Sequence, residues 1–147
     1  MIFPDYEGGS LVNLMRSLGD ACGTTTPLPY APLHDAKVSL RDTARNIVLL
    51  VIDGLGYNYL QRHGAGGHLH EHLCTQLTSV FPSTTASAVT TLLSGLAPQQ
   101  HALTGWHMYF SDLFAIRRPP RPTPRGTRFS DTTPGTLSQR LFGHAPF

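Results

Sequence analysis

The 147-residue sequence predicts an α/β protein in which helices flank a doubly wound, mostly parallel sheet. Two segments with strand character, 46–52 and 75–81, are each followed by a segment with helical character. This alternation is typical of parallel strands joined by crossover helices. Functional groups of such sheets gather at the carboxyl ends of the strands. The residues that follow positions 52 and 81 are therefore where a site is expected.

The first element is a short amphipathic helix that begins after Ser10. Serine is a favourable N-cap, and apolar residues follow it at helical spacing: Leu11, Leu14, Met15 and Leu18. The sequence "GDACG", Gly19–Gly23, ends the helix. Residues 24–45 contain three prolines and no sustained periodicity, so they are interpreted as a connecting segment.

The first strand is predicted at "NIVLLVI", Asn46–Ile52. A continuous run of β-branched residues and leucine indicates a strand that is buried on both faces. The run ends abruptly at "DGLG". The following segment, Tyr57–Gly64, is predicted to be a short helix that ends at a glycine.

A second strand is predicted at Thr75–Phe81, where polar and apolar positions partly alternate, and Pro82 ends it. A helix follows from about Thr84 to Leu93, with small residues that allow close approach to a sheet. His107–Ile116 has the aromatic and β-branched character of a third strand or hairpin arm. The predicted core thus covers about 46–116, and 117–147 is a loop region rich in proline and arginine.

Composition narrows the class of protein. The net charge is +2, and six of the eleven basic residues lie after position 116 among prolines, without the aromatics or motif of a nucleic-acid-binding module. Cys22 and Cys74 lack metal or disulfide spacing, which indicates free thiols in a reducing compartment. Residues 1–10 do not resemble a signal peptide, and no apolar run reaches the ~18 residues of a membrane span. A soluble, cytoplasmic protein without membrane contact is expected.

Asp53 is the first candidate site residue, because it follows a buried strand and precedes two glycines. A carboxylate there can bind a cation, although capping of the next helix is an alternative. A Rossmann fingerprint fails because Tyr59 stands at the third glycine position, and a P-loop sequence is absent. An aspartyl-phosphate phosphatase is disfavoured because Leu55 occupies the position of its second carboxylate.

The second candidate lies in "VFPSTTASAVTTLLSG", Val80–Gly95, which is unusually rich in hydroxyl residues for a helix. If the two strands are parallel, the start of this helix lies at the same sheet edge as Asp53, with N–H groups and the positive dipole end directed there. A hydroxyl activated by a cation at Asp53 can act as a nucleophile. The alternative is that Ser83, Thr84 or Thr85 is only an N-cap.

The stretches "VLLVIDGLG" and "SVFPSTTASAVTTLLSGLAPQQHALTGW" together resemble the nucleotide pyrophosphatase/phosphodiesterase branch of the alkaline phosphatase superfamily, over about Leu11–Phe110. The resemblance implies an alkaline-phosphatase-like fold and metal-dependent hydrolysis of a phosphodiester or nucleotide pyrophosphate. It also implies that Thr85 attacks phosphorus, and that Asp53 and Thr85 are metal ligands in a site that holds two zinc ions when complete.

The resemblance extends to a turn with Gly95, Pro98 and His101 in register, where His101 is expected to fix the turn after the nucleophile helix. Two residues depart from the family. Ala102 replaces the usual glycine, and Trp106 stands where many members have a phosphoryl-binding asparagine. The indole N–H of Trp106 can serve as that donor, so Trp106 is a candidate substrate-binding residue; a core or substrate-stacking role is the alternative.

Further metal ligands of the family lie downstream, and after position 110 this chain has only Asp112, Asp131 and His144. The expectation is therefore the N-terminal portion of one phosphodiesterase-like domain, 1–147, incomplete at its C-terminus and with little activity alone. "HLHEH" places His68, His70 and His72 at a spacing that on a strand could bind zinc, and it is interpreted as a surface cluster. Two other functions stay open: a phosphomonoester or phosphonate hydrolase, and a non-catalytic fragment or interaction module. Substrate, metal identity and oligomeric state are not predicted.

Overall fold

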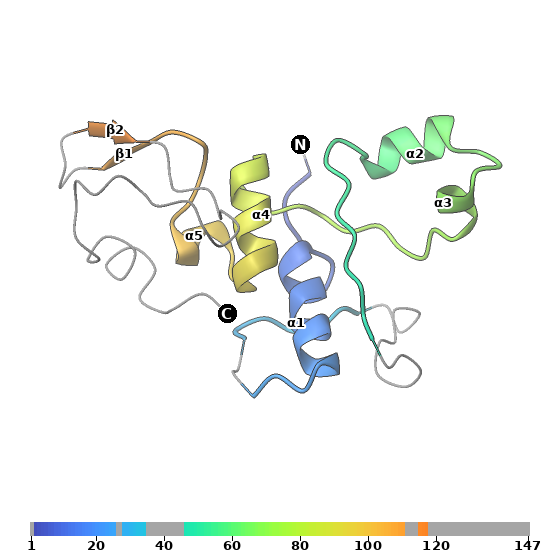
Figure 1. Ribbon diagram of the computed structural model, residues 1–147, viewed down its shortest axis with the longest axis horizontal. Coiled ribbons are helices and arrows are strands. Elements are labelled where there is room, and N and C mark those ends of the chain that lie inside the picture. Colours follow the sequence, from blue (N-terminus) through green and yellow to red (C-terminus); the bar gives the residue numbers. More distant parts are fainter. Residues whose placement is uncertain (1, 26–27, 35–45, 111–114, 118–147) are drawn as a thin grey trace. The chain divides into compact units, whose positions relative to one another are not determined.

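The computed structural model describes residues 2–25, 28–34, 46–110 and 115–117. The chain divides into two compact units, Met1–Ser79 and Val80–Phe147, and each is described by itself. Figure 1 labels five helices and two short strands among the described residues. Most of the proline- and arginine-rich region predicted at 117–147 lies outside these residues.

Helix α1, Leu11–Ala21, organises the first unit and begins where the sequence predicts. Ser10 is its N-cap, and the Oδ1 of Asn13 accepts hydrogen bonds from the Ser10 backbone N–H at 3.0 Å and hydroxyl at 2.6 Å. Val12 and Asn13 are fully buried. The Asn13 amide also donates to the carbonyls of Tyr6 and Ala31, at 2.8 and 2.9 Å. One side chain thereby ties the helix to the segments before and after it.

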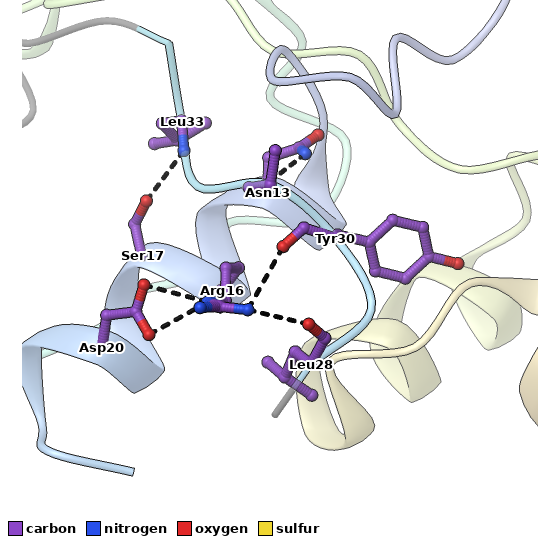
Figure 2. A network of polar contacts seen from close by, with 8 residues as sticks. Asn13, Arg16, Ser17, Asp20, Leu28, Tyr30 and Leu33 are labelled. Atoms are coloured by element: carbon purple, nitrogen blue, oxygen red, sulfur yellow. Dashed lines mark hydrogen bonds and ion pairs between the residues drawn. The ribbon is translucent and has the colours of Figure 1, made fainter. Parts of the chain in front are cut away.

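Two further side chains of α1 hold the segment 28–34, as Figure 2 shows. The Arg16 Nε donates to both carboxylate oxygens of Asp20 at 2.9 Å, and its Nη1 donates to the Leu28 carbonyl at 2.8 Å. The Ser17 hydroxyl accepts from the Leu33 N–H at 2.9 Å. The proline-containing connection predicted after α1 is therefore attached to the helix by polar contacts.

The first predicted strand, Asn46–Ile52, is not formed in this structure. The segment has no strand assignment, and its apolar side chains are exposed, Val48 at 89% and Leu50 at 76%. A strand buried on both faces requires neighbours on both edges and a layer on each face. In the described ranges no segment pairs with 46–52, so the run is left uncovered.

The second predicted strand, Thr75–Phe81, survives only as a single parallel bridge between Thr78 and Ser10. The Thr78 N–H donates to the Gly9 carbonyl at 2.8 Å, and the Leu11 N–H donates to the Thr78 carbonyl at 3.1 Å. Between the two segments, α2, Tyr57–His63, ends at Gly64 as predicted, and α3, His68–Glu71, follows and contacts α2.

The second unit contains α4, Thr85–Ser94, packed against α5, Pro98–His101. Its buried residues come from both helices and the segments beside them, and they include Val80, Ser87, Thr91, Ala97, Pro98 and His101. Strands β1, Met108–Phe110, and β2, Ala115–Arg117, form an antiparallel pair with Tyr109 opposite Ile116. The hairpin alternative for 107–116 is thus the one observed, with β2 extending to Arg117. Within the described ranges, no helix has the length and apolar character needed to cross a membrane.

Candidate functional site

Asp53 occupies a tight turn at the end of the exposed apolar run. The Leu55 N–H donates to the Ile52 carbonyl at 3.4 Å, and Gly54 has a φ of +80°. A positive φ at the third residue is the signature of a type II turn and favours glycine there. Asp53, the second residue, is exposed. The "DG" pair therefore turns the chain sharply and presents a carboxylate to solvent.

The start of α4 resolves the question of the N-cap. Thr84 is the cap: its Oγ1 accepts from the Ser87 N–H at 3.3 Å and lies 2.9 Å from the Ser87 hydroxyl. The same oxygen donates to the Thr104 carbonyl at 3.3 Å. Thr85 is the first residue of the helix and is half-buried. The capping alternative is thus correct for Thr84 and wrong for Thr85.

Much of the hydroxyl content of α4 has a structural use in this unit. The Thr90 and Ser94 hydroxyls donate to carbonyls four residues earlier, at 2.8 and 2.7 Å. The Ser94 hydroxyl also accepts from the Leu96 N–H at 3.2 Å, at the point where Gly95 ends the helix with a φ of 69°. Serine and threonine are unfavourable inside helices, but here their hydroxyls form hydrogen bonds with the backbone of the same helix. These hydrogen bonds account for much of the serine and threonine content of α4.

His101 fixes the turn that follows α4, as the sequence predicts. Its Nδ1 accepts from the Leu103 N–H at 3.1 Å, so in the neutral ring Nε2 carries the hydrogen and donates to the Thr91 hydroxyl at 3.2 Å. Burial lowers the pKa of His101 below its ordinary value. Hydrogen bonds with the backbone of His101 and Ser87 raise the pKa, but by less. The imidazole is therefore a neutral structural connector between α4 and α5.

The two departures from the family pattern lie just beyond α5. Ala102 is the C-cap of this helix and has a φ of 59°. Glycine adopts this left-handed conformation without strain, which explains why a glycine is usual at this position in the family. Trp106 lies in a bend and is 39% exposed. That exposure argues against a core role and leaves the indole accessible from solvent.

The predicted metal-site residues come from different units: Asp53 from Met1–Ser79 and Thr85 from Val80–Phe147. Each offers an oxygen, a donor type that divalent cations accept. A two-zinc site, however, holds each ion by about three or four protein ligands. Two such ligands are fewer than a two-zinc site requires.

Among the residues that the structure describes, one group of three potential metal ligands lies together: His68, Glu71 and His72. A zinc site formed by His68, His70 and His72 requires a strand, and this set does not include Glu71. The segment is helical, so spacings of three and four residues, rather than two, bring side chains together. Helical spacing was the signal that would have selected Glu71 in place of His70.

Comparison with known proteins identifies one family. The family model described as type I phosphodiesterase / nucleotide pyrophosphatase matches residues 47–129, more than half of the chain. The matched range contains all three candidate residues, Asp53, Thr85 and Trp106. No curated protein and no solved structure matches the chain.

Proposed function

The chain belongs to the type I phosphodiesterase/nucleotide pyrophosphatase family, and on that premise we propose that it hydrolyses a phosphodiester or nucleotide pyrophosphate bond with Thr85 as the nucleophile. The observation that carries the proposal is the match of the family to a range that includes both the Asp-Gly turn and the start of α4. The substrate is a small nucleotide or another small phosphodiester.

The position of Thr85 supports its role. As the first residue of a ten-residue helix, it stands where N–H groups of the first turn and the helix dipole favour a negatively charged phosphoryl group. Because Thr84 does the capping, the chain does not need the Thr85 hydroxyl for that purpose. Thr84 thus performs the capping, and Thr85 is the residue proposed for the chemical step.

The proposed reaction has two steps. The Thr85 Oγ1 forms a bond to phosphorus while the bond from phosphorus to the leaving alkoxide or phosphate breaks, and the hydroxyl proton is released to solvent or to the leaving group. Water then attacks phosphorus, the bond to Oγ1 breaks, and the hydroxyl is regenerated with release of the monoester. The first-turn N–H groups of α4 stabilise negative charge on the non-bridging oxygens in both steps.

Asp53 is proposed to hold a divalent metal, with zinc as the expected ion. A bound divalent cation supplies Lewis-acid activation of the attacking oxygen. Asp53 is exposed at the tip of its turn, and a carboxylate is a donor type that divalent cations accept. The exposed indole of Trp106 is proposed to contact the substrate, by its N–H or by stacking on a base.

Family membership implies an alkaline-phosphatase-like α/β fold. We infer that 46–52 and 75–81 are strands of its doubly wound sheet. The exposed side chains of Val48 and Leu50 support this inference, because covering apolar side chains with other elements stabilises the folded state. Thr78 forms a parallel bridge with Ser10, which shows that the backbone of 75–81 can pair with a neighbouring segment.

The proposal is tested by hydrolysis of bis(p-nitrophenyl) phosphate with and without added zinc. We expect slow, zinc-dependent turnover that falls to background in Thr85→Ala and in Asp53→Ala. Ser83→Ala is the matched control, because it removes an exposed hydroxyl two residues before Thr85. Turnover that persists in Thr85→Ala, or a folded wild-type protein without turnover, would contradict the proposal. Faster hydrolysis of p-nitrophenyl phosphate than of the diester would favour a phosphomonoesterase instead.

A further inference from the structure

The cluster formed by His68, Glu71 and His72 lies outside the motifs of the family, and nothing in the proposed reaction uses it. One ligand atom from each residue lies within 4.8 Å of the other two, and all three residues are exposed. From this juxtaposition we propose that the three side chains form a zinc-binding site on the first unit, in addition to the metal that Asp53 is proposed to hold.

Helix geometry brings the ligands together. His68 and Glu71 are the first and last residues of α3, and His72 is its C-cap. Residues at i, i+3 and i+4 share one face of a helix, and two histidines four residues apart are a recognised zinc-binding arrangement. His70 stands at i+2, where its side chain is directed to a different face.

The backbone selects the tautomer of His72 that zinc binding needs. Its Nδ1 lies 2.9 Å from the His68 carbonyl oxygen, which can only accept, so Nδ1 carries the hydrogen. In the neutral ring Nε2 then holds a lone pair and is directed away from that bond. Zinc-ligating histidines commonly donate their other N–H to a carbonyl in this way, which orients the ring. His72 is thus already oriented as a ligand.

The other two ligands need only small movements. The His68 and His72 rings lie side by side, with centroids 4.1 Å apart and planes tilted by 42°. A tetrahedral ion with bonds of about 2.0–2.2 Å separates its ligand atoms by about 3.4 Å, so the cluster must contract slightly. Exposed side chains can do this by changing rotamer. The Glu71 carboxylate adds the negative charge that two neutral imidazoles lack.

The donor set selects the metal. Two imidazoles and one carboxylate suit zinc and other late first-row ions, whereas magnesium and calcium prefer oxygen ligands alone. Three protein ligands leave the fourth tetrahedral position to water. Because α3 has only four residues, its helical form has little intrinsic stability, and an ion that joins its two ends would stabilise the turn.

The test is zinc titration of tag-free, reduced protein by calorimetry, with equilibrium dialysis for stoichiometry. His68→Gln and His72→Gln are each expected to remove one zinc per chain or to weaken zinc binding at least about tenfold. A loss of this size is already typical when a residue that hydrogen-bonds to a metal ligand is replaced. Glu71→Gln is expected to weaken binding as well. His70→Gln is the matched control from the same helix. Asp53→Asn should leave zinc binding at the cluster unchanged, because the two sites are separate.

Nitrogen chemical shifts provide a second readout that does not depend on catalysis. Zinc is expected to shift the Nε2 resonance of His72 and to leave its Nδ1–H in place, and millimolar magnesium is expected to do neither. Equal losses in His70→Gln and His72→Gln would indicate non-specific binding to a histidine-rich surface and would overturn the proposal. Unchanged zinc binding in His68→Gln and His72→Gln would overturn it too. Because all three residues are exposed, the variants should fold, which circular dichroism checks.

Discussion

The hydroxyl of Thr91 in α4 lies 3.2 Å from Nε2 of His101 in α5, and both side chains are buried. The other ring nitrogen of His101 accepts from the backbone of Leu103, so the ring connects two helices and the chain beyond them. This contact defines the turn that follows the proposed nucleophile helix. The stability of the second unit should therefore depend on it.

Replacing Thr91 by valine should destabilise the second unit by about 0.5–1.5 kcal/mol, because the buried Nε2–H of His101 loses its hydrogen bond to the Thr91 hydroxyl. Trp106, the single tryptophan of the chain, lies in this unit, so its fluorescence during urea unfolding reports the change. Thr90→Val is the matched control, since the Thr90 hydroxyl donates to the Ala86 carbonyl of its own helix at 2.8 Å. Equal losses in the two variants would mean that the contact with His101 contributes nothing.

Acidification should weaken the same unit through His101. Burial lowers its folded-state pKa, so the unfolded chain binds a proton at higher pH than the folded one. The stabilisation is complete above the ordinary histidine value of about 6.5 and is lost as pH falls through the lowered pKa. A protonated ring would also turn Nδ1 into a donor facing the Leu103 N–H. His101→Gln should remove this part of the pH dependence, and an unchanged slope between pH 7.5 and 5 would contradict the assignment.

Ala102→Gly should stabilise the second unit. Alanine in the left-handed region costs about 1–2 kcal/mol, and the greater freedom of glycine in the unfolded chain offsets about 0.4–1 kcal/mol of that gain. The net increase in unfolding free energy should lie between about 0 and 1.6 kcal/mol, read from Trp106 fluorescence. Ala97→Gly is the control, because Ala97 has a negative φ of −82° and should lose stability. A destabilised Ala102→Gly variant would contradict the observed backbone conformation.

Asn13→Asp should destabilise the first unit by more than about 2 kcal/mol. The substitution removes the two N–H donors that reach the Tyr6 and Ala31 carbonyls and buries a carboxylate. Hydrogen exchange of the α1 amides should accelerate accordingly. The same change at the exposed Asn58 in α2 serves as the control. Comparable protection of the α1 amides in the wild type and Asn13→Asp would show that this network is not what holds the helix.

Local signals in the sequence predicted α1, α2 and α4, but not the four-residue helices α3 and α5. The caps of α1 and α4, the glycine that ends α2 and the turn at Asp53 all follow from side chains within a few residues of one another. The structural role of His101 is expected from the family resemblance of the turn, and its partners Thr91 and Leu103 lie nearby in the chain.

The strands could not be established in the same way, because a strand is defined by neighbours that are distant in sequence. Asn46–Ile52 has the composition of a buried strand but no pairing partner among the described residues. The candidate site shares this difficulty, since its two residues, Asp53 and Thr85, belong to different units. The sequence indicates a surface cluster at His68, His70 and His72, and the grouping of Glu71 with His68 and His72 follows only from the helical form of the segment.

The most direct test of the central claim is to identify the residue that becomes bonded to phosphorus. The protein is mixed with zinc and bis(p-nitrophenyl) phosphate, quenched in acid within the first turnover and digested for peptide mass spectrometry. The account predicts a p-nitrophenyl phosphate adduct on Thr85 that is absent from Thr85→Ala and present in Ser83→Ala. An adduct on another residue, or turnover with no adduct at Thr85, would contradict it.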